Sequence, residues 1–175
     1  MKLVVAVDKN WGIGNKGGLL AHVRADLRYF QSLTKGNVVI LGSKTLATFP
    51  NGMPLKNREN IILSRRIDFS PEGATVVHSL AELLETLKNY DTETVFVIGG
   101  STVYDLLLEY CDTAYVTKFD KEFESDAFFC NLDESPEWEL ESVGKKQISN
   151  PETDTVSDME FAFCVYKRTA RKKAL

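Results

Sequence analysis

Asp26 is the residue whose position in this sequence raises the sharpest chemical question. It lies in a segment of helical pattern, Ala25–Leu33, and Phe30 and Leu33 follow it at spacings of four and seven residues. The carboxylate therefore shares a helix face with apolar side chains. Burial there would raise its pKa and allow proton exchange near neutrality. An ordinary first-turn position would instead lower the pKa through the helix dipole. The pattern alone leaves both interpretations open and favours the second.

The paired glycines Gly99 and Gly100 form a second candidate, because they separate a buried strand from a helix start. Val95–Ile98 is apolar on both faces, as a buried parallel strand should be, and Thr102–Tyr110 has a helical pattern. Glycines let a backbone approach a phosphate closely, and free amides at a helix start attract anions. By itself the segment is equally compatible with a tight turn that binds nothing.

Two further strand ends carry hydroxyl groups and cations. Gly42–Thr45 joins the strand-like run Val38–Leu41 to a short helix, and Ser64–Arg66 follows another such run. Arginine side chains bind phosphate in a bidentate manner. Ligands of parallel sheets bind beyond the carboxyl ends of the strands. The convergence of three such ends therefore favours an anion-binding site over a set of solvated loops.

The segment Gly12–Gly17 matches the literal G-x-G-x-x-G pattern and follows the strand-like run Leu3–Val7. The dinucleotide fingerprint also requires that its third glycine open a helix and that an acidic residue follow about twenty positions later. Gly18–Val23 has no cap and little helical pattern. We therefore expect a long, glycine-rich, mobile loop that can act as a lid, and not a Rossmann site.

The composition narrows the classes of protein further. A chain of 175 residues with 43% hydrophobic and 26% charged residues fits one globular domain. The net charge of −4 argues against nucleic-acid binding, and no apolar run approaches the roughly 20 residues of a membrane span. The three cysteines are scattered, which predicts neither a disulfide framework nor a metal site and favours a cytoplasmic setting.

Strand-like and helix-like segments alternate first, and strands then follow one another. The expected strands are Leu3–Val7, Val38–Leu41, Asn60–Leu63, Ala74–Val77, Val95–Ile98, Ala114–Phe119, Trp138–Val143 and Phe161–Tyr166. The expected helices are Ala25–Leu33, Lys44–Thr48, Leu80–Asn89 (capped by Ser79) and Thr102–Tyr110. This order indicates an α/β domain whose mostly parallel sheet has an antiparallel end.

Taken together, these segments resemble the dihydrofolate reductase family over nearly the whole chain. The resemblance is carried by the order and spacing of short matches: Val4–Asp8 with Gly12–Gly14, Ala25–Phe30, Val39–Thr45, Pro54–Arg65, Val97–Gly100, Tyr115–Thr117 and Asp126–Phe129.

The resemblance implies a single domain over residues 1–168, followed by a basic tail, 169–175. Its fold is a twisted, eight-stranded, mostly parallel sheet with an antiparallel C-terminal strand, flanked by about four helices. It also implies reduction of 7,8-dihydrofolate to 5,6,7,8-tetrahydrofolate by hydride transfer from NADPH, in support of one-carbon and thymidylate metabolism. The resemblance suggests a cytoplasmic monomer that binds neither nucleic acid nor membrane and needs no metal.

The resemblance assigns roles to a set of substrate-binding residues. Asp26 would be the catalytic residue, accepting paired hydrogen bonds from the pterin and favouring protonation of its N5 atom, while Thr117 supports it. Arg58 would clamp the α-carboxylate of the glutamate tail. The remaining residues would line the apolar slot or offer backbone carbonyls: Leu27, Phe30, Phe49, Leu55, Val4, Val5 and Ile98.

A second set of residues would bind NADPH. Gly99 and Gly100, joined by a cis peptide, would hold the pyrophosphate with Ser101, Thr102 and Val103. Lys44 and Thr45 would bind phosphates from the other side. Ser64 and Arg65 would face the 2′-phosphate and so select NADPH over NADH. The other cofactor-binding positions are Ala6, Ile13, Gly14, Leu19, Gly42, Ser43, Leu63, Ile98 and Tyr104.

Some positions depart from the family pattern. Leu20 and Ala21 stand where the family usually has Pro-Trp, and Ser43 stands where a basic residue is common. The usual tryptophan packs near the nicotinamide and orders a water, so proton delivery can differ here. Two alternatives remain: the related reductase of riboflavin synthesis, which lacks counterparts of Asp26 and Arg58, and a relative that binds ligand without catalysis.

Overall fold

The computed structural model describes all 175 residues, and its main sheet has the strand order β10-β12-β8-β1-β7-β4-β5-β6. The chain divides into two compact units. The first comprises Met1–Leu3, Thr34–Cys111 and Lys172–Leu175, and the second comprises Val4–Leu33 and Asp112–Arg171. Strand β1 (Lys2–Val7) contributes residues to both units.

The first unit contains the parallel part of the sheet. Its strands are β7 (Val95–Gly99), β4 (Val38–Gly42), β5 (Glu59–Leu63) and β6 (Thr75–Val77), joined by parallel pairings, and Lys2 and Leu3 of β1 pair in parallel with β7. Its helices are α2 (Ser43–Leu46), α3 (Leu80–Leu87) and α4 (Ser101–Leu107), with short 3-10 turns at Pro50–Gly52, Thr92–Thr94 and Leu108–Tyr110. Burial of consecutive residues in β4 and β5 explains why these strands are apolar on both faces.

The second unit contains the antiparallel part of the sheet. Strand β12 (Glu160–Arg168) pairs antiparallel with β8 (Thr113–Phe119), β10 (Trp138–Val143) and β11 (Gln147–Ile148). A second, small sheet is formed by β3 (Gly18–Leu19), β2 (Gly12–Asn15) and β9 (Ala127–Phe128). Helix α1 (Arg24–Thr34) belongs to this unit except for its last residue.

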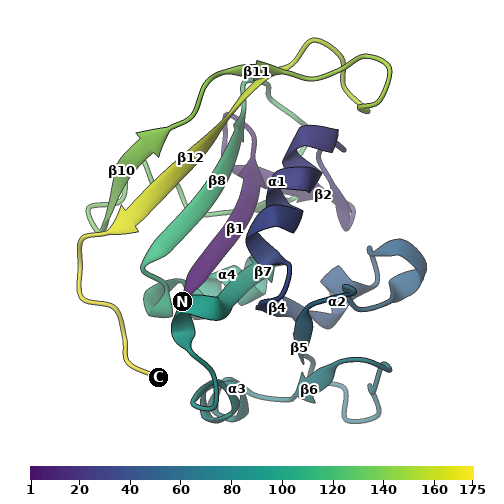
Figure 1. Cartoon of the computed structure of the whole chain (residues 1–175), viewed down its shortest axis with the longest axis vertical. Coiled ribbons are helices and arrows are strands. Elements are labelled where there is room, and N and C mark those ends of the chain that lie inside the picture. The colour runs from purple at the N-terminus through teal and green to yellow at the C-terminus, as the bar shows by residue number, and fades with distance from the viewer. The chain divides into compact units, whose positions relative to one another are not determined.

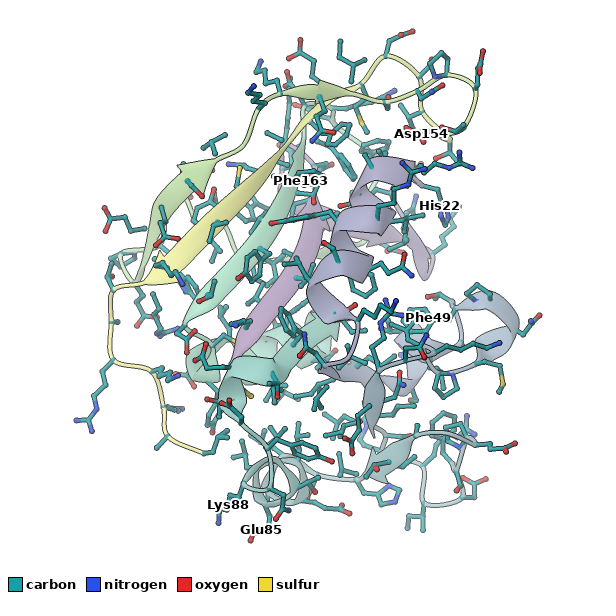
Figure 2. All side chains as sticks on the ribbon, viewed as in Figure 1. His22, Phe49, Glu85, Lys88, Asp154 and Phe163 are labelled. Carbon is teal, nitrogen blue, oxygen red and sulfur yellow. The ribbon has the colours of Figure 1, made fainter.

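Helix α1 is positioned by aromatic packing within the second unit. The ring of Tyr29 stacks on Phe163 of β12, with 4.1 Å between ring centroids, and meets Tyr115 of β8 edge-on at 6.5 Å. Figure 1 shows α1 to the right of these strands, and Figure 2 shows Phe163 pointing toward the helix. Such contacts fix the rotation of the helix about its axis and therefore the direction in which Asp26 points.

The predicted elements are confirmed: all eight expected strands form the main path of the sheet, and the four expected helices are present with ends shifted by a few residues. Gly17 is followed by β3 and not by the helix start that the dinucleotide fingerprint requires. The sequence did not predict that Gly12–Leu19 forms a hairpin, whose turn has positive φ at Lys16 (50°) and Gly17 (80°). Glycine-rich strands lack the side-chain alternation by which strands are identified.

Two classes of feature are not found in the structure. None of the helices is both long and apolar enough to span a bilayer. No group of three or more histidine, cysteine, aspartate or glutamate side chains is arranged to hold a metal ion.

Removal of the cap of α3 should lower the stability of the protein. The Ser79 hydroxyl accepts a hydrogen bond from the Glu82 amide at 3.1 Å. Ser79→Ala should therefore reduce the free energy of unfolding in urea by about 1 kcal/mol. Ser79→Asp, which keeps an acceptor, should retain most of the stability, and Ser70→Ala at an exposed loop position should leave it unchanged. Equal stability of Ser79→Ala and wild type would show that the cap does not contribute.

Candidate active site

The Asp26 carboxylate is held by one strong hydrogen bond. It lies in the first turn of α1, and the buried hydroxyl of Thr117 on β8 donates to its Oδ1 atom at 2.6 Å. Burial raises the pKa of Asp26 and outweighs the bond from Thr117, which lowers it. The structure therefore supports the apolar-face interpretation of this residue over the helix-dipole interpretation.

The second oxygen of the carboxylate has no hydrogen bond to another protein group, so Asp26 can accept hydrogen bonds from a ligand. Leu27, beside it, is 44% exposed, whereas Phe30 is half-buried. Burial also raises the pKa of Tyr29, with a contribution from the charge of Asp26. Asp26 is thus a carboxylate that can be protonated more easily than usual and that lies next to apolar side chains.

The guanidinium group of Arg58 is fixed from behind by two neighbours. Its Nε and Nη2 atoms both donate to the hydroxyl of buried Thr34 at 3.2 Å, and Nη1 donates to the carbonyl of Lys56 at 2.8 Å. Since a guanidinium group has five N–H donors, one N–H remains on each of Nη1 and Nη2. Two N–H groups on neighbouring nitrogens can bind the two oxygens of a carboxylate. Burial lowers the pKa of Arg58, but an arginine side chain stays charged.

Three of the predicted apolar site residues come together in the first unit. Phe49, Leu55 and Ile98 pack against one buried cluster, which consists of Val39, Leu41, Leu46 and Ile62. Buried Asn60 fixes the backbone of Leu55 from both sides: it accepts from the Leu55 amide at 3.0 Å and donates to the Leu55 carbonyl at 2.9 Å. The other predicted apolar residues, Val4 and Val5, are buried in β1.

The predicted cofactor glycines lie in crowded surroundings. The Gly99–Gly100 peptide is cis, as expected from the resemblance, and Gly99 has a φ of 116°. A Cβ atom on Gly100 would lie 3.1 Å from Oγ1 of Thr45, and one on Gly99 would lie 3.1 Å from the ring of Tyr104. Gly42 is equally confined, because its Cβ would lie 3.3 Å from Val103. The carboxyl ends of β4 and β7 therefore lie close together, and at both ends glycines leave the backbone without side chains just before α2 and α4 begin.

The remaining predicted cofactor residues differ in how far their side chains are exposed to solvent. Ser64 is 3% exposed, and its hydroxyl accepts from the Arg66 amide at 3.2 Å, while Arg65 is exposed. The Ser64 carbonyl lies 2.8 Å from Nδ1 of His78. Lys44 and Thr102 are exposed, whereas Ser43, Leu63 and Ser101 are half-buried.

The glycine-rich hairpin is fastened at its tip. Asp126 accepts from the Lys16 amide at 2.9 Å through its carboxylate and donates from its own amide to the Gly14 carbonyl at 3.0 Å. Gly14 pairs with Leu19, which is 56% exposed, and Ile13 between the glycines is half-buried. Ala6 of β1 packs on the apolar cluster that contains Ala21 and Val23.

Several residues that orient the site were missed in the sequence. Thr34 and Asn60 act on Arg58 and Leu55, and Asp154 contacts the start of α1. Two of these three contacts join positions far apart in the chain: Thr34 is 24 residues from Arg58, and Asp154 is 130 residues from Arg24. No local pattern marks them, so the fold was needed to find them.

The comparisons with known proteins agree with this geometry. The family model described as dihydrofolate reductase matches residues 1–168. The chain belongs to the dihydrofolate reductase family. It is 36% identical to the dihydrofolate reductase of Bacillus subtilis (strain 168), over 99% of this chain and 98% of that protein. It is 34% identical to that of Staphylococcus haemolyticus, over 96% of this chain and 95% of that protein.

A solved dihydrofolate reductase has the same fold. The enzyme from Enterococcus faecalis, complexed with NADP(H) and RAB-propyl, superposes with a TM-score of 0.83 and 30% identity, covering 97% of this chain and 96% of that chain. The single α/β domain predicted from the sequence is therefore confirmed. Dihydrofolate reductases use NADPH, and the confined backbone at Gly42, Gly99 and Gly100 fits a cofactor whose phosphates require close backbone approach.

Gly100→Ala should weaken the binding of NADPH. The added methyl group would push Thr45 away from the backbone, because the two would otherwise lie 3.1 Å apart. We expect the dissociation constant of NADPH to rise by about tenfold, which corresponds to a loss of about 1.4 kcal/mol. Fluorescence titration with NADPH measures this change, and circular dichroism checks that the variant folds. Unchanged affinity in a folded variant would show that this backbone is not part of the cofactor site.

Proposed function

We propose that this chain reduces 7,8-dihydrofolate to 5,6,7,8-tetrahydrofolate with NADPH as the reductant, in support of one-carbon and thymidylate metabolism. The observation that carries the proposal is the Asp26 carboxylate, whose pKa is raised by burial and which is held by Thr117 in a chain of the dihydrofolate reductase family. A reductase of this kind needs a carboxylate that orients the pterin and exchanges a proton near neutrality.

Asp26 performs the central task in this proposal. Its free carboxylate oxygen, together with the lone pairs that remain on Oδ1, accepts hydrogen bonds from the amino group and ring N–H of the pterin. NADPH, when bound, supplies the hydride. The pterin N5 must gain a proton, and Asp26 favours this step because burial raises its pKa, so that the carboxyl group keeps a proton to a higher pH than an ordinary aspartate does.

The other proposed substrate contacts exclude water and fix the tail. Leu27 and Phe30 offer apolar surface on the helix of Asp26, and exclusion of water there strengthens the hydrogen bonds of its carboxylate. Phe49, Leu55 and Ile98 offer apolar surface in the first unit. Arg58 binds the α-carboxylate of the glutamate tail through its remaining Nη1 and Nη2 donors, held in place by Thr34. Val4 and Val5 offer backbone carbonyl groups.

The proposed cofactor contacts are divided between bare backbone and cations. Gly99, Gly100 and the first residues of α4 hold the pyrophosphate, with Thr45 and Lys44 on the neighbouring strand end. Arg65 is the cation that binds the 2′-phosphate, because it is exposed and the hydroxyl of Ser64 already accepts the Arg66 amide. This arrangement selects NADPH over NADH.

We propose a cytoplasmic setting for this function from the cysteines and the net charge of the chain. The three cysteines form no disulfide, which suits a reducing cytoplasm, and the net charge of −4 disfavours nucleic acid as a partner. We take the working unit to be a monomer, as the family resemblance suggests.

The direct test of the proposal is the rate of loss of absorbance at 340 nm with NADPH and dihydrofolate. The wild type should turn over, and Asp26→Asn should be slower by about a hundredfold at neutral pH, because the amide can neither accept the same paired hydrogen bonds nor exchange the proton. No turnover by the wild type would overturn the proposed function, and full activity of Asp26→Asn would overturn the role of Asp26.

The pH dependence of the same assay adds a signed prediction. Because burial raises the pKa of Asp26, the carboxyl group keeps its proton to a higher pH than an ordinary aspartate does. Wild-type turnover should therefore be full below the raised pKa and should decline as the pH rises through it. Asp26→Asn should lack this decline, since residue 26 no longer titrates. The same decline in both proteins would assign the titration to another group.

Arg58→Leu should separate the binding of the tail from the binding of the pterin. Loss of a charged, bidentate contact should raise KM for dihydrofolate by about tenfold to a hundredfold. The KM for a dihydropteridine that lacks the benzoylglutamate tail should not change. Lys145→Leu, which removes an exposed cation without a described contact, is the matched control. An equal rise in KM for both substrates would contradict the role of Arg58.

A further inference from the structure

The first turn of α1 is capped by a residue from a remote loop. The Leu27 amide bonds to the carbonyl of Val23 at 3.0 Å, so Val23 is the cap residue of the helix, and its side chain has no acceptor. The first helical amide, that of Arg24, donates instead to Oδ1 of Asp154 at 2.9 Å. Figure 2 shows Asp154 and His22 at the N-terminal end of α1. The cap is thus supplied by loop 149–159.

The Asp154 carboxylate is itself held rigidly. Its Oδ2 atom accepts from the Asn150 amide at 2.8 Å, and Oδ1 also accepts from the Thr153 hydroxyl at 3.1 Å. Thr155, the next residue, forms two bonds with His22: its hydroxyl accepts from the His22 amide at 2.9 Å, and its amide donates to the His22 carbonyl at 3.0 Å. Residues 22 and 24 are therefore both fastened to this loop.

The loop can hold the start of α1 in place because the residues at its C-terminal end pack in the apolar core. Met159 and Phe161 belong to the buried cluster that contains Val23, and Val156 packs against the same cluster. The Met159 amide donates to the hydroxyl of buried Ser149 at 2.9 Å, which closes the loop at its base. Asp154 is therefore a fixed point to which the start of α1 is bound.

Asp26 lies two residues after Arg24, and its bond to Thr117 constrains where the first turn must lie. Fraying of the first turn would let the Asp26 carboxylate move away from Thr117 and into water. We propose that Asp154 is a positioning residue for the catalytic carboxylate: it caps the first amide of α1 and so holds Asp26 against Thr117. The proposal rests on the proposed role of Asp26 in the reduction of dihydrofolate.

The charges around the two carboxylates allow the cap to work at neutral pH. The backbone bond from Arg24 lowers the pKa of Asp154, with further contributions from the Asn150 amide and the charge of Arg24, so the carboxylate is ionised. The Asp26 carboxylate faces the Thr117 hydroxyl and influences the phenol of Tyr29. A change in the titration of Asp26 after mutation of Asp154 therefore reports a change in burial or in charge, which the variants below distinguish.

The test compares Asp154→Ala with Asp154→Asn, whose amide oxygen can accept the same bond without a charge. For Asp154→Ala we expect kcat with dihydrofolate to fall by about fivefold to tenfold. In this variant the decline of turnover with rising pH should occur at a lower pH than in the wild type. The amide of Leu27 should exchange with deuterium faster. The affinity for NADPH should not change. Asp154→Asn should restore the rate to within about twofold of wild type, together with the wild-type pH profile.

Controls separate the possible failures. Glu152→Ala removes a negative charge from the same loop and should behave as wild type. If Asp154→Ala does not fold, Asp154→Glu replaces it, because the added methylene displaces the acceptor while keeping the charge; it should show the same loss. Wild-type kcat, pH profile and exchange in Asp154→Ala would overturn the proposal, as would equal impairment of Asp154→Asn.

The two proposals fail in different ways. If the wild type does not reduce dihydrofolate, the proposed function is overturned. Deuterium exchange of α1 and NMR titration of the Asp26 carboxyl group in Asp154→Ala then decide whether Asp154 positions Asp26, since neither measurement needs turnover.

Discussion

The structure depends on keeping the Asp26 carboxylate partly out of water while leaving it able to accept hydrogen bonds from a ligand. Asp26 is held at one oxygen by Thr117, and its burial costs enough to raise its pKa. An acid whose pKa is raised on folding binds protons more tightly in the folded state. The protein is therefore destabilised as the pH rises from the ordinary pKa of aspartate through the raised value. The burial that destabilises the protein in this way also raises the pKa of Asp26, which suits the residue to proton exchange with a ligand.

The surroundings of Asp26 compensate by restricting its helix. The ring of Tyr29 stacks on Phe163, Val23 is fully buried at the start of the helix, and Asp154 caps its first amide. Arg58 follows the same principle, since Thr34 and Lys56 use three of its donors and leave two pointing elsewhere. In both cases a group that must bind a ligand has its orientation set by neighbours that do not bind it.

The sequence predicted the main elements because each carried its own local signal. The buried strands of the first unit are short apolar runs, and α3 has both a cap and a regular apolar stripe. The hairpin Gly12–Leu19 gave no such signal, since its geometry depends on glycines and on Asp126. Asp26 is intermediate: its spacing showed an apolar face, but only the position of β8 decided between burial and helix dipole. Thr34 and Asp154 act across the chain, so no local pattern could identify them.

The most direct measurement of this account is the titration of the Asp26 carboxyl group in the wild-type protein by NMR of 13C-labelled aspartate. Its resonance can be assigned by its absence from Asp26→Asn. Burial against α1 and β8 predicts a midpoint clearly above the value of about 4 that is ordinary for aspartate. A midpoint at or below that value would show that the carboxylate is solvated or stabilised by the helix dipole, and would contradict the account.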